Sequence, residues 1–152
     1  MVLTEKETAA LKDLRSQEKV CAQKYEKYST QAKDPELRNL FQTLQKEEQK
    51  HYESLGQVLN GTVPECDCND SAGRDYAPKA TYMSDDNSQD KTDDSFLATD
   101  CIGTEKLVSS EYNTDVFVFG EPGVRKLLAD IQVEEQNHAE MLYKYKTVNR
   151  MS

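Results

Sequence analysis

The sequence predicts an all-α protein, a four-helix bundle made of two repeated helical hairpins that a long crossover connection joins. Three observations lead to this prediction: an internal repeat, apolar side chains at helical spacing in four segments, and a loss of that spacing between Thr62 and Thr92. One helical hairpin cannot bury its own apolar stripe, whereas two hairpins packed together can. We expect a single domain over 1–152, with hairpin one at 4–60, an acidic crossover linker at 61–93 and hairpin two at 94–148.

The repeat is visible when the sequence is shifted by 87 positions, which carries Glu48 onto Glu135. The pattern Glu-Glu-Gln-x-His then occurs in both copies, at 47–51 and at 134–138. Further identities are spread through both copies: Glu18 with Glu105, Lys19 with Lys106, Tyr25 with Tyr112, Pro35 with Pro122, Arg38 with Arg125, Leu40 with Leu127, and Leu55 with Leu142. Because the matches are chemically specific, chance explains them poorly.

Hairpin one begins with a helix over about 4–33, because Thr4 and Glu7 form a capping-box pattern. Asp34 and Pro35 then mark the N-cap and the first position of a second helix, which ends near Asn60 and Gly61. Each helix has one inward stripe with alternate spacings of three and four. The stripes are Leu11, Leu14, Glu18, Cys21, Tyr25, Tyr28 and Ala32, and Leu37, Phe41, Leu44, Glu48, His51, Leu55 and Val58.

The linker is rich in Pro, Gly, Ser and Asp and has no apolar period, so we interpret it as a long connection with solvated aspartates and expect protease to cut it without loss of the bundle. Its length lets the third helix run parallel to the second. Its aspartates lack the frame of a calcium loop. Cys66 and Cys68 do not have the Cys-x-x-Cys spacing of a zinc ribbon and are interpreted as free thiols, with a metal site or a strained disulfide as alternatives.

Hairpin two repeats this organisation, with a helix from about Asp93 or Asp94 to Phe119, a turn at Gly120-Glu121-Pro122 and a last helix over about 122–147. The expected stripes are Ala98, Cys101, Glu105, Val108, Tyr112, Asp115 or Val116, and Phe119, followed by Val124, Leu128, Ile131, Glu135, His138, Leu142 and Tyr145.

Six strongly polar side chains stand at mid-helix on these inward stripes, where leucine is usual: Glu18, Glu48, His51, Glu105, Glu135 and His138. In each hairpin the two glutamates lie at similar distances from the turn, so folding places them opposite each other. Like charges in a dry interior would force protonation or unfolding unless cations hold them. Two divalent cations cancel four carboxylates while both histidines stay neutral.

This pattern matches the ligand set of di-iron and di-manganese carboxylate bundles, in which two helices each supply a Glu and two supply Glu-x-x-His. We expect iron or manganese, and zinc also fits these ligands. A single Glu-x-x-His is ordinarily a surface feature, so the prediction depends on two copies with partner glutamates. Glu47 and Glu134 turn about 100° away from the stripe, so we expect each to face solvent or a neighbouring helix edge. Substitutions of these two residues are the matched controls for substitutions of the candidate ligands.

Four further side chains lie beside these candidate ligands. Tyr25 and Tyr112 stand two turns along the same faces, where each is either a hydrogen-bond donor to a ligand or an ordinary core tyrosine. Cys21 and Cys101 are interpreted as small core residues.

The charge balance excludes two classes of partner. A net charge of −9 and a pI near 4.8 argue against binding nucleic acid or an anionic membrane surface. No apolar run is long enough for a membrane span, and the first residues lack the apolar core of a signal peptide, so we expect synthesis in the cytoplasm.

The second half resembles the Coat F domain of spore coat proteins from endospore-forming bacteria. The residues that carry this resemblance are 104–106, 112–114, Glu121-Pro122-Gly123-Val124-Arg125, 131–138 and Tyr143-Lys144-Tyr145. The first half looks like a diverged copy, and the whole chain resembles the ferritin-like superfamily, which includes rubrerythrin and bacterioferritin. The resemblance implies location in the spore coat and makes coat proteins, or a homodimer, the candidate partners. No rubredoxin-like domain is present, so rubrerythrin-type turnover is not implied.

Two functions follow as hypotheses. The first is a di-metal protein, in which open metal positions could support oxidase or peroxidase-type chemistry. The alternative is a non-catalytic structural spore coat component, in which the metal only stabilises the bundle. No catalytic residue is assigned by the sequence.

Overall fold

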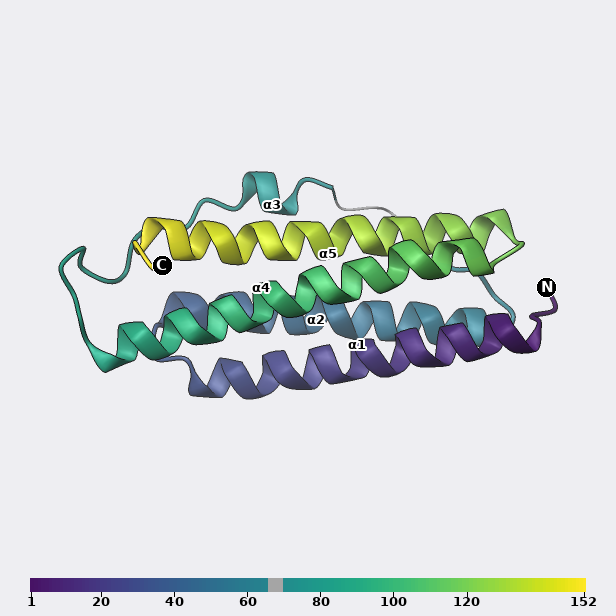
Figure 1. The fold of residues 1–152 in the computed structure, drawn as a ribbon, viewed down its shortest axis with the longest axis horizontal. Helices are drawn as coiled ribbons and strands as arrows, with labels where there is room; N and C mark the ends of the chain where they lie inside the picture. Colours follow the sequence, from purple (N-terminus) through teal and green to yellow (C-terminus); the bar gives the residue numbers. More distant parts are fainter. Residues whose placement is uncertain (66–69) are drawn as a thin grey trace.

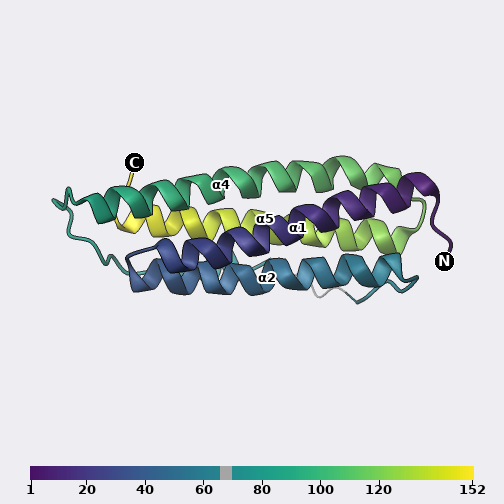
Figure 2. The ribbon, with the colours of Figure 1, turned by 90° about the horizontal axis from the view of Figure 1, so that it is seen from below.

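The computed structural model describes residues 1–65 and 70–152 and confirms an all-α bundle, with no strand in these ranges. Four long helices form two hairpins, and α2 and α4 run in the same direction (Figures 1 and 2). The first hairpin comprises α1 (Glu5–Gln31) and α2 (Pro35–Leu59), and the second comprises α4 (Gln89–Asp115) and α5 (Pro122–Val148). None of the described helices combines the length and the apolar character of a membrane span.

The ends of the helices follow from local sequence. Thr4 caps α1 with Glu7 in a complete capping box, and Asp34 caps α2 ahead of Pro35. After α2 the chain turns at Gly61, whose φ of 93° is easily adopted only by glycine. Its N–H donates to the carbonyl of Val58, and the next N–H donates to the carbonyl of Gln57, which satisfies the last carbonyls of the helix.

The third long helix differs from the prediction at both ends. We expect a start near Asp93 or Asp94, whereas α4 begins at Gln89 because the Ser88 side chain accepts a hydrogen bond from the N–H of Lys91. We expect an end at Phe119, whereas α4 stops at Asp115 and a 3-10 turn (Val116–Val118) follows. Asp115 and Val116 are therefore only half-buried.

The described parts of the crossover contact the bundle at two places, although this segment has no apolar period. It contains the one-turn helix α3 (Ala72–Asp75), which lies on the outer side of α5 (Figure 1). The N–H of Gly73 donates to the side-chain oxygen of Asn137 at 2.7 Å, and Lys144 donates to the carbonyls of Gly73 and Arg74. A Cβ at Gly73 would meet a carboxylate oxygen of Glu140 at 2.5 Å, so only glycine fits without rearrangement.

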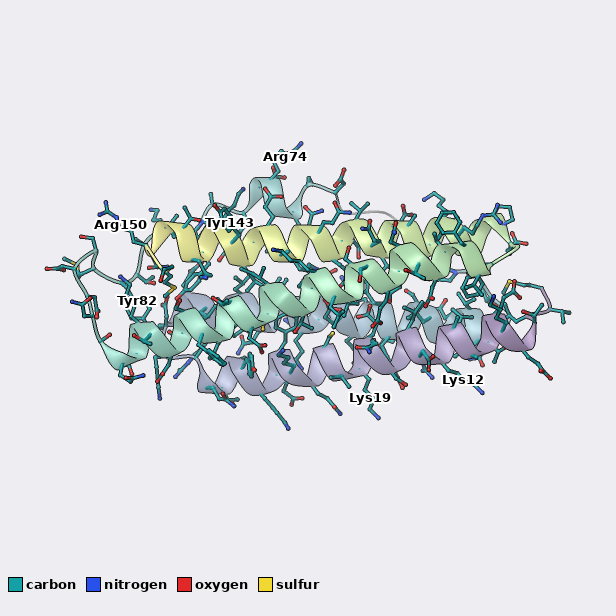
Figure 3. The ribbon with its side chains drawn as sticks, in the orientation of Figure 1. Lys12, Lys19, Arg74, Tyr82, Tyr143 and Arg150 are labelled. Carbon is teal, nitrogen blue, oxygen red and sulfur yellow. The ribbon has the colours of Figure 1, made fainter. Side chains whose placement is uncertain are left out.

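A second anchor holds the crossover further along. The backbone N–H groups of Thr81 and Tyr82 both donate to the side-chain oxygen of Asn149, and the Tyr82 hydroxyl donates to Asp94. In Figure 3, Tyr82 lies beside the bundle while Lys12, Lys19 and Arg74 project into solvent. The predicted thiols Cys66 and Cys68 lie outside the described residues.

Carboxylates hold the two hairpins together in matching ways. Glu7 of α1 accepts from the N–H of Gly120 in the second turn, and Asp94 of α4 accepts from the N–H groups of Lys33 and Asp34 in the first turn. The repeat carries Glu7 onto Asp94. Each hairpin therefore stabilises the turn of the other.

The apolar core is divided into two clusters. One lies towards the N-terminal end of α1 and includes Leu11, Leu55 and Ile131, and the other lies towards its C-terminal end and includes Phe41 and Leu142. Nearly all the predicted stripe residues are buried, although Tyr28 is half-buried because its hydroxyl donates to Asp100. Between the two clusters lies a polar layer.

Candidate metal centre

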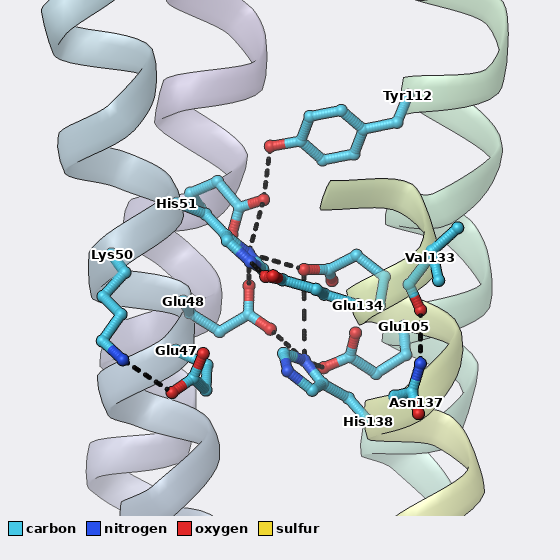
Figure 4. A network of polar contacts seen from close by, with 12 residues as sticks. Glu47, Glu48, Lys50, His51, Glu105, Tyr112, Val133, Glu134, Asn137 and His138 are labelled. Atoms are coloured by element: carbon cyan, nitrogen blue, oxygen red, sulfur yellow. Dashed lines mark hydrogen bonds and ion pairs between the residues drawn. The ribbon is translucent and has the colours of Figure 1, made fainter. Parts of the chain in front are cut away.

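The polar layer consists of the six candidate ligands, one Glu from each of α1 and α4 and Glu-x-x-His from each of α2 and α5 (Figure 4). All are almost completely buried, with exposures of 0–3%: Glu18, Glu48, His51, Glu105, Glu135 and His138. The i, i+3 spacing places each His on the same face as its Glu. The structure thus gathers in one layer residues that are far apart in the sequence.

Both imidazole rings turn Nδ1 towards the carboxylates. His51 Nδ1 lies 2.8 Å from Glu135, 3.5 Å from Glu48 and 3.6 Å from Glu18. His138 Nδ1 has the corresponding contacts, at 2.8 Å from Glu48 and 3.4 Å from Glu105. Each His therefore approaches most closely the glutamate of the opposite Glu-x-x-His segment.

The side chains form two overlapping groups, in each of which the potential ligand atoms lie within 4.8 Å of one another. One group contains Glu18 and His51, the other contains Glu105 and His138, and both contain Glu48 and Glu135. Two groups of ligands that share two carboxylates have the arrangement in which the shared carboxylates bridge a pair of metal ions. The buried clusters are consistent with a dinuclear carboxylate site.

Several oxygen and nitrogen atoms of this layer point inward without a hydrogen-bond partner among the described residues, despite short ion-pair distances. They are Glu18 Oε2, Glu48 Oε2, His51 Nδ1, Glu105 Oε2 and both carboxylate oxygens of Glu135. Buried polar atoms are normally hydrogen-bonded, since an unpaired one costs about 1–3 kcal/mol. Because these atoms converge on one small volume and are the donor types that divalent metals bind, the site fits a pair of metal ions.

Comparison with known families adds an independent observation. The model of the Coat F domain matches residues 6–60 and, a second time, residues 93–147. The chain belongs to the Coat F domain family. Both hairpins are thus copies of one domain, as the internal repeat predicts, and the family has the ferritin-like bundle fold that the sequence indicates. No curated protein and no solved structure matches this chain.

Without a metal, protons must balance the charge in this Coat F protein. Burial raises the pKa of Glu18 and of Glu135, and neighbouring carboxylates raise both further. Burial alone would lower the pKa of His138, but Glu105 and Glu48 outweigh it and raise the value to about 10, and His51 is shifted in the same direction. Burial also opposes ionisation of Glu48, yet its hydrogen bonds lower its pKa. Metal ions therefore compete with protons for these side chains.

Two tyrosines connect the hairpins through the candidate ligands. The Tyr25 hydroxyl donates to Glu105 Oε1 at 2.5 Å, and the Tyr112 hydroxyl donates to Glu18 Oε1 at 2.5 Å. Each tyrosine is fully buried and holds the glutamate of the other repeat. The second oxygen of each of these glutamates is buried and has no hydrogen-bond partner among the described residues. Both tyrosines thus donate to candidate ligands, and both also belong to the apolar core clusters.

Glu134 is a site neighbour that the sequence reasoning missed. It lies at the edge between α5 and α2, one of the two places that the helix period predicts, but its Oε2 also lies 2.5 Å from His51 Nε2, and its side chain is only 13% exposed (Figure 4). Glu47, its counterpart, instead pairs with Lys50 at 3.1 Å. The helix period indicates a side chain at the edge of a helix. It does not indicate which of the two glutamates reaches a histidine.

Cys21 and Cys101 are buried free thiols near the layer. Burial raises the pKa of each, and neighbouring carboxylates of the site add to the effect. Neither belongs to the clustered ligand atoms among the described residues, in agreement with their interpretation as small core residues.

Proposed function

We propose that this Coat F protein binds two divalent metal ions, one near His51 and one near His138, with Glu48 and Glu135 bridging them. The observation that carries the proposal is the overlap of the two buried groups in these two carboxylates. Glu18 and Glu105 would each complete one position. The four carboxylates then neutralise two divalent charges in a volume that excludes water.

Iron or manganese suits this donor set best, because carboxylate oxygens predominate and imidazole nitrogen supplements them, and zinc also fits. We further propose an oxidase or peroxidase-type activity for the loaded protein. When bound and reduced, a pair of such ions would supply two electrons, which together with two protons convert hydrogen peroxide to two water molecules.

The residues of the chain itself would prepare the site for this chemistry. Tyr25 and Tyr112 fix the orientation of Glu105 and Glu18 through their hydroxyl groups. The apolar clusters on both sides exclude bulk water from the layer. A cavity of about 70 Å³ borders His138 and is lined also by Glu47, Ala72 and Glu134, which is room for a ligand of water size.

The alternative is a structural role, in which the ions stabilise a bundle that serves as a component of the spore coat. The near-complete burial of all six candidate ligands favours it, since a closed site stabilises a fold without turnover. In both cases family membership supports a location in the spore coat, with coat proteins or a second copy of this chain as partners.

Elemental analysis of purified protein at known concentration tests the metal proposal. We expect two equivalents of iron or manganese per chain, and fewer than one equivalent of any divalent metal after loading would contradict it. Peroxide consumption by the reduced, loaded protein then separates the two functions. Turnover supports the enzyme, and retention of metal without turnover supports the structural role.

A further inference from the structure

The two proposed metal positions would be equivalent if the repeat were perfect, but their surroundings differ. The repeat carries Glu47 onto Glu134, Lys50 onto Asn137 and His51 onto His138. Glu47 and Glu134 have different contacts, and so do Lys50 and Asn137. The difference concerns the side of each imidazole ring that faces away from the carboxylates of the site.

Behind His51, the Glu134 carboxylate crosses from α5 to α2 and contacts Nε2 at 2.5 Å. Behind His138, no corresponding contact comes from Glu47 among the described residues. Glu47 pairs with Lys50 on its own helix, at 3.1 Å, and its side chain is 28% exposed. His138 borders the small cavity instead. The His51 ring is therefore held by the Glu134 carboxylate, whereas Glu47 does not hold the His138 ring in this way.

This contact determines what His51 can offer to a metal. When Nδ1 binds a metal ion, Nε2 carries the ring proton and can donate a hydrogen bond to Glu134 Oε2, which lies 2.5 Å away. A carboxylate behind a ligating imidazole fixes the tautomer and the ring orientation, and it makes the ligating nitrogen more basic. His51 thus presents a preoriented, electron-rich donor, whereas His138 does not receive this support from Glu47.

We propose that Glu134 is a positioning residue that makes the His51 position the tighter of the two, so that the two metal ions bind in order. This inference rests on the proposed dinuclear function. The two metal positions have the same types of ligand because of the repeat, yet the inference assigns them unequal affinities for metal ions. It also assigns a function to a residue that lies outside the inward stripe.

Titration of the metal-free full chain with cobalt(II), followed by the visible absorption of the bound ion, tests this. In the wild type we expect two resolved steps. Glu134→Gln keeps the size of the side chain and loses its charge, so it should weaken the first step about 10- to 100-fold and leave the second unchanged. Glu134→Asp should restore part of the loss. Glu47→Gln is the matched control and should alter neither step.

A spectroscopic measurement separates positioning from a general structural effect. At one equivalent of cobalt, the wild type should show a single paramagnetically shifted imidazole N–H resonance with slow solvent exchange, which His51→Ala removes. In Glu134→Gln this proton should exchange faster. Two cobalt ions of equal affinity in the wild type, or equal effects of Glu134→Gln and Glu47→Gln, would overturn the inference and leave the proposed function intact. Absence of cobalt binding would overturn both.

Discussion

Hairpin one (α1 and α2) and hairpin two (α4 and α5) make several pairs of matching contacts with each other, whereas other contacts of the two repeats differ. The matched contacts are Tyr25 with Glu105 and Tyr112 with Glu18, His51 with Glu135 and His138 with Glu48, and Glu7 with Gly120 and Asp94 with Lys33. Every one of these joins one repeat to the other. The contacts of the shared polar layer and of the two turns thus account for the similarity of the two copies at these positions.

The two repeats differ away from these matched contacts. Asn137 on α5 binds the crossover, whereas its counterpart Lys50 on α2 is exposed. Lys24 forms an ion pair with Asp100 at 2.6 Å, whereas the counterpart of Lys24 is Glu111, which faces Asp13. The matched contacts thus lie in the candidate metal layer and at the two turns, and the repeats diverge elsewhere, including between α1 and α4.

The largest effects are expected from the two carboxylates that both groups share. Glu48→Ala and Glu135→Ala should each lower the affinity for both metal ions by more than 100-fold, because each removes a bridging ligand. His51→Ala and His138→Ala should each weaken mainly one position. Metal content per chain after loading measures the difference. Equal losses from all four variants would show that the site is not built from two overlapping groups.

Removal of metal should make stability depend on pH. The raised pKa values of His51 and His138 stabilise the metal-free fold below the ordinary value of 6.5, and this contribution is lost as the pH rises towards about 10. The raised pKa values of Glu18 and Glu135 act in the same direction, because their ionisation in the core destabilises the folded state. The lowered pKa of Glu48 acts oppositely, but only below its ordinary value of 4.5.

The melting temperature of the chelated protein should accordingly be several degrees lower at pH 9 than at pH 6, since about 1 kcal/mol shifts it by roughly 2–4 °C in a chain of this size. The metal-loaded protein is the control, and its melting temperature should change less between pH 6 and pH 9. A chelated protein that melts at the same or a higher temperature at pH 9 would contradict the proton balance described for the site.

A smaller effect is expected from loss of the contact between Asn137 and the crossover. Asn137→Ala removes the acceptor for the N–H of Gly73, a buried group, and should cost about 1–3 kcal/mol. Limited proteolysis should then cut the chain between Ala72 and Asp86 faster than in the wild type. Lys50→Ala, at the equivalent position of hairpin one, should leave the rate unchanged. Equal protection in both variants would mean that other contacts hold the crossover.

The smallest effect is expected on the face between α1 and α4. Burial raises the pKa of Glu111, and Asp115 and Asp13 raise it further, so Glu111→Lys should replace repulsion by an ion pair like that of Lys24 with Asp100. Partly exposed pairs contribute about 0–1 kcal/mol. Denaturant unfolding at low and high salt should show a small stabilisation that salt reduces. Destabilisation at low salt would show that the surroundings of positions 111 and 24 are not equivalent in geometry.

The sequence predicts the bundle and the clustering of the six acidic and imidazole side chains because both depend on periodicity. Glu18 and Glu105 stand on apolar stripes, and the repeat pairs each with a Glu-x-x-His segment. The contact of Glu134 with His51 depends on how two helices approach each other, which spacing along one helix does not specify. The packing of the crossover depends on hydrogen bonds from its backbone to Asn137 and Asn149, and such bonds have no period.

Anomalous diffraction from crystals of the iron-loaded protein, recorded at the iron edge, tests the central claim most directly. The account predicts two peaks roughly 3.5–4 Å apart. One peak should lie beside His51 Nδ1 and the other beside His138 Nδ1, with Glu48 and Glu135 reaching both. A single peak, or peaks only on the protein surface, would contradict the proposal that the two Coat F repeats together build one dinuclear centre.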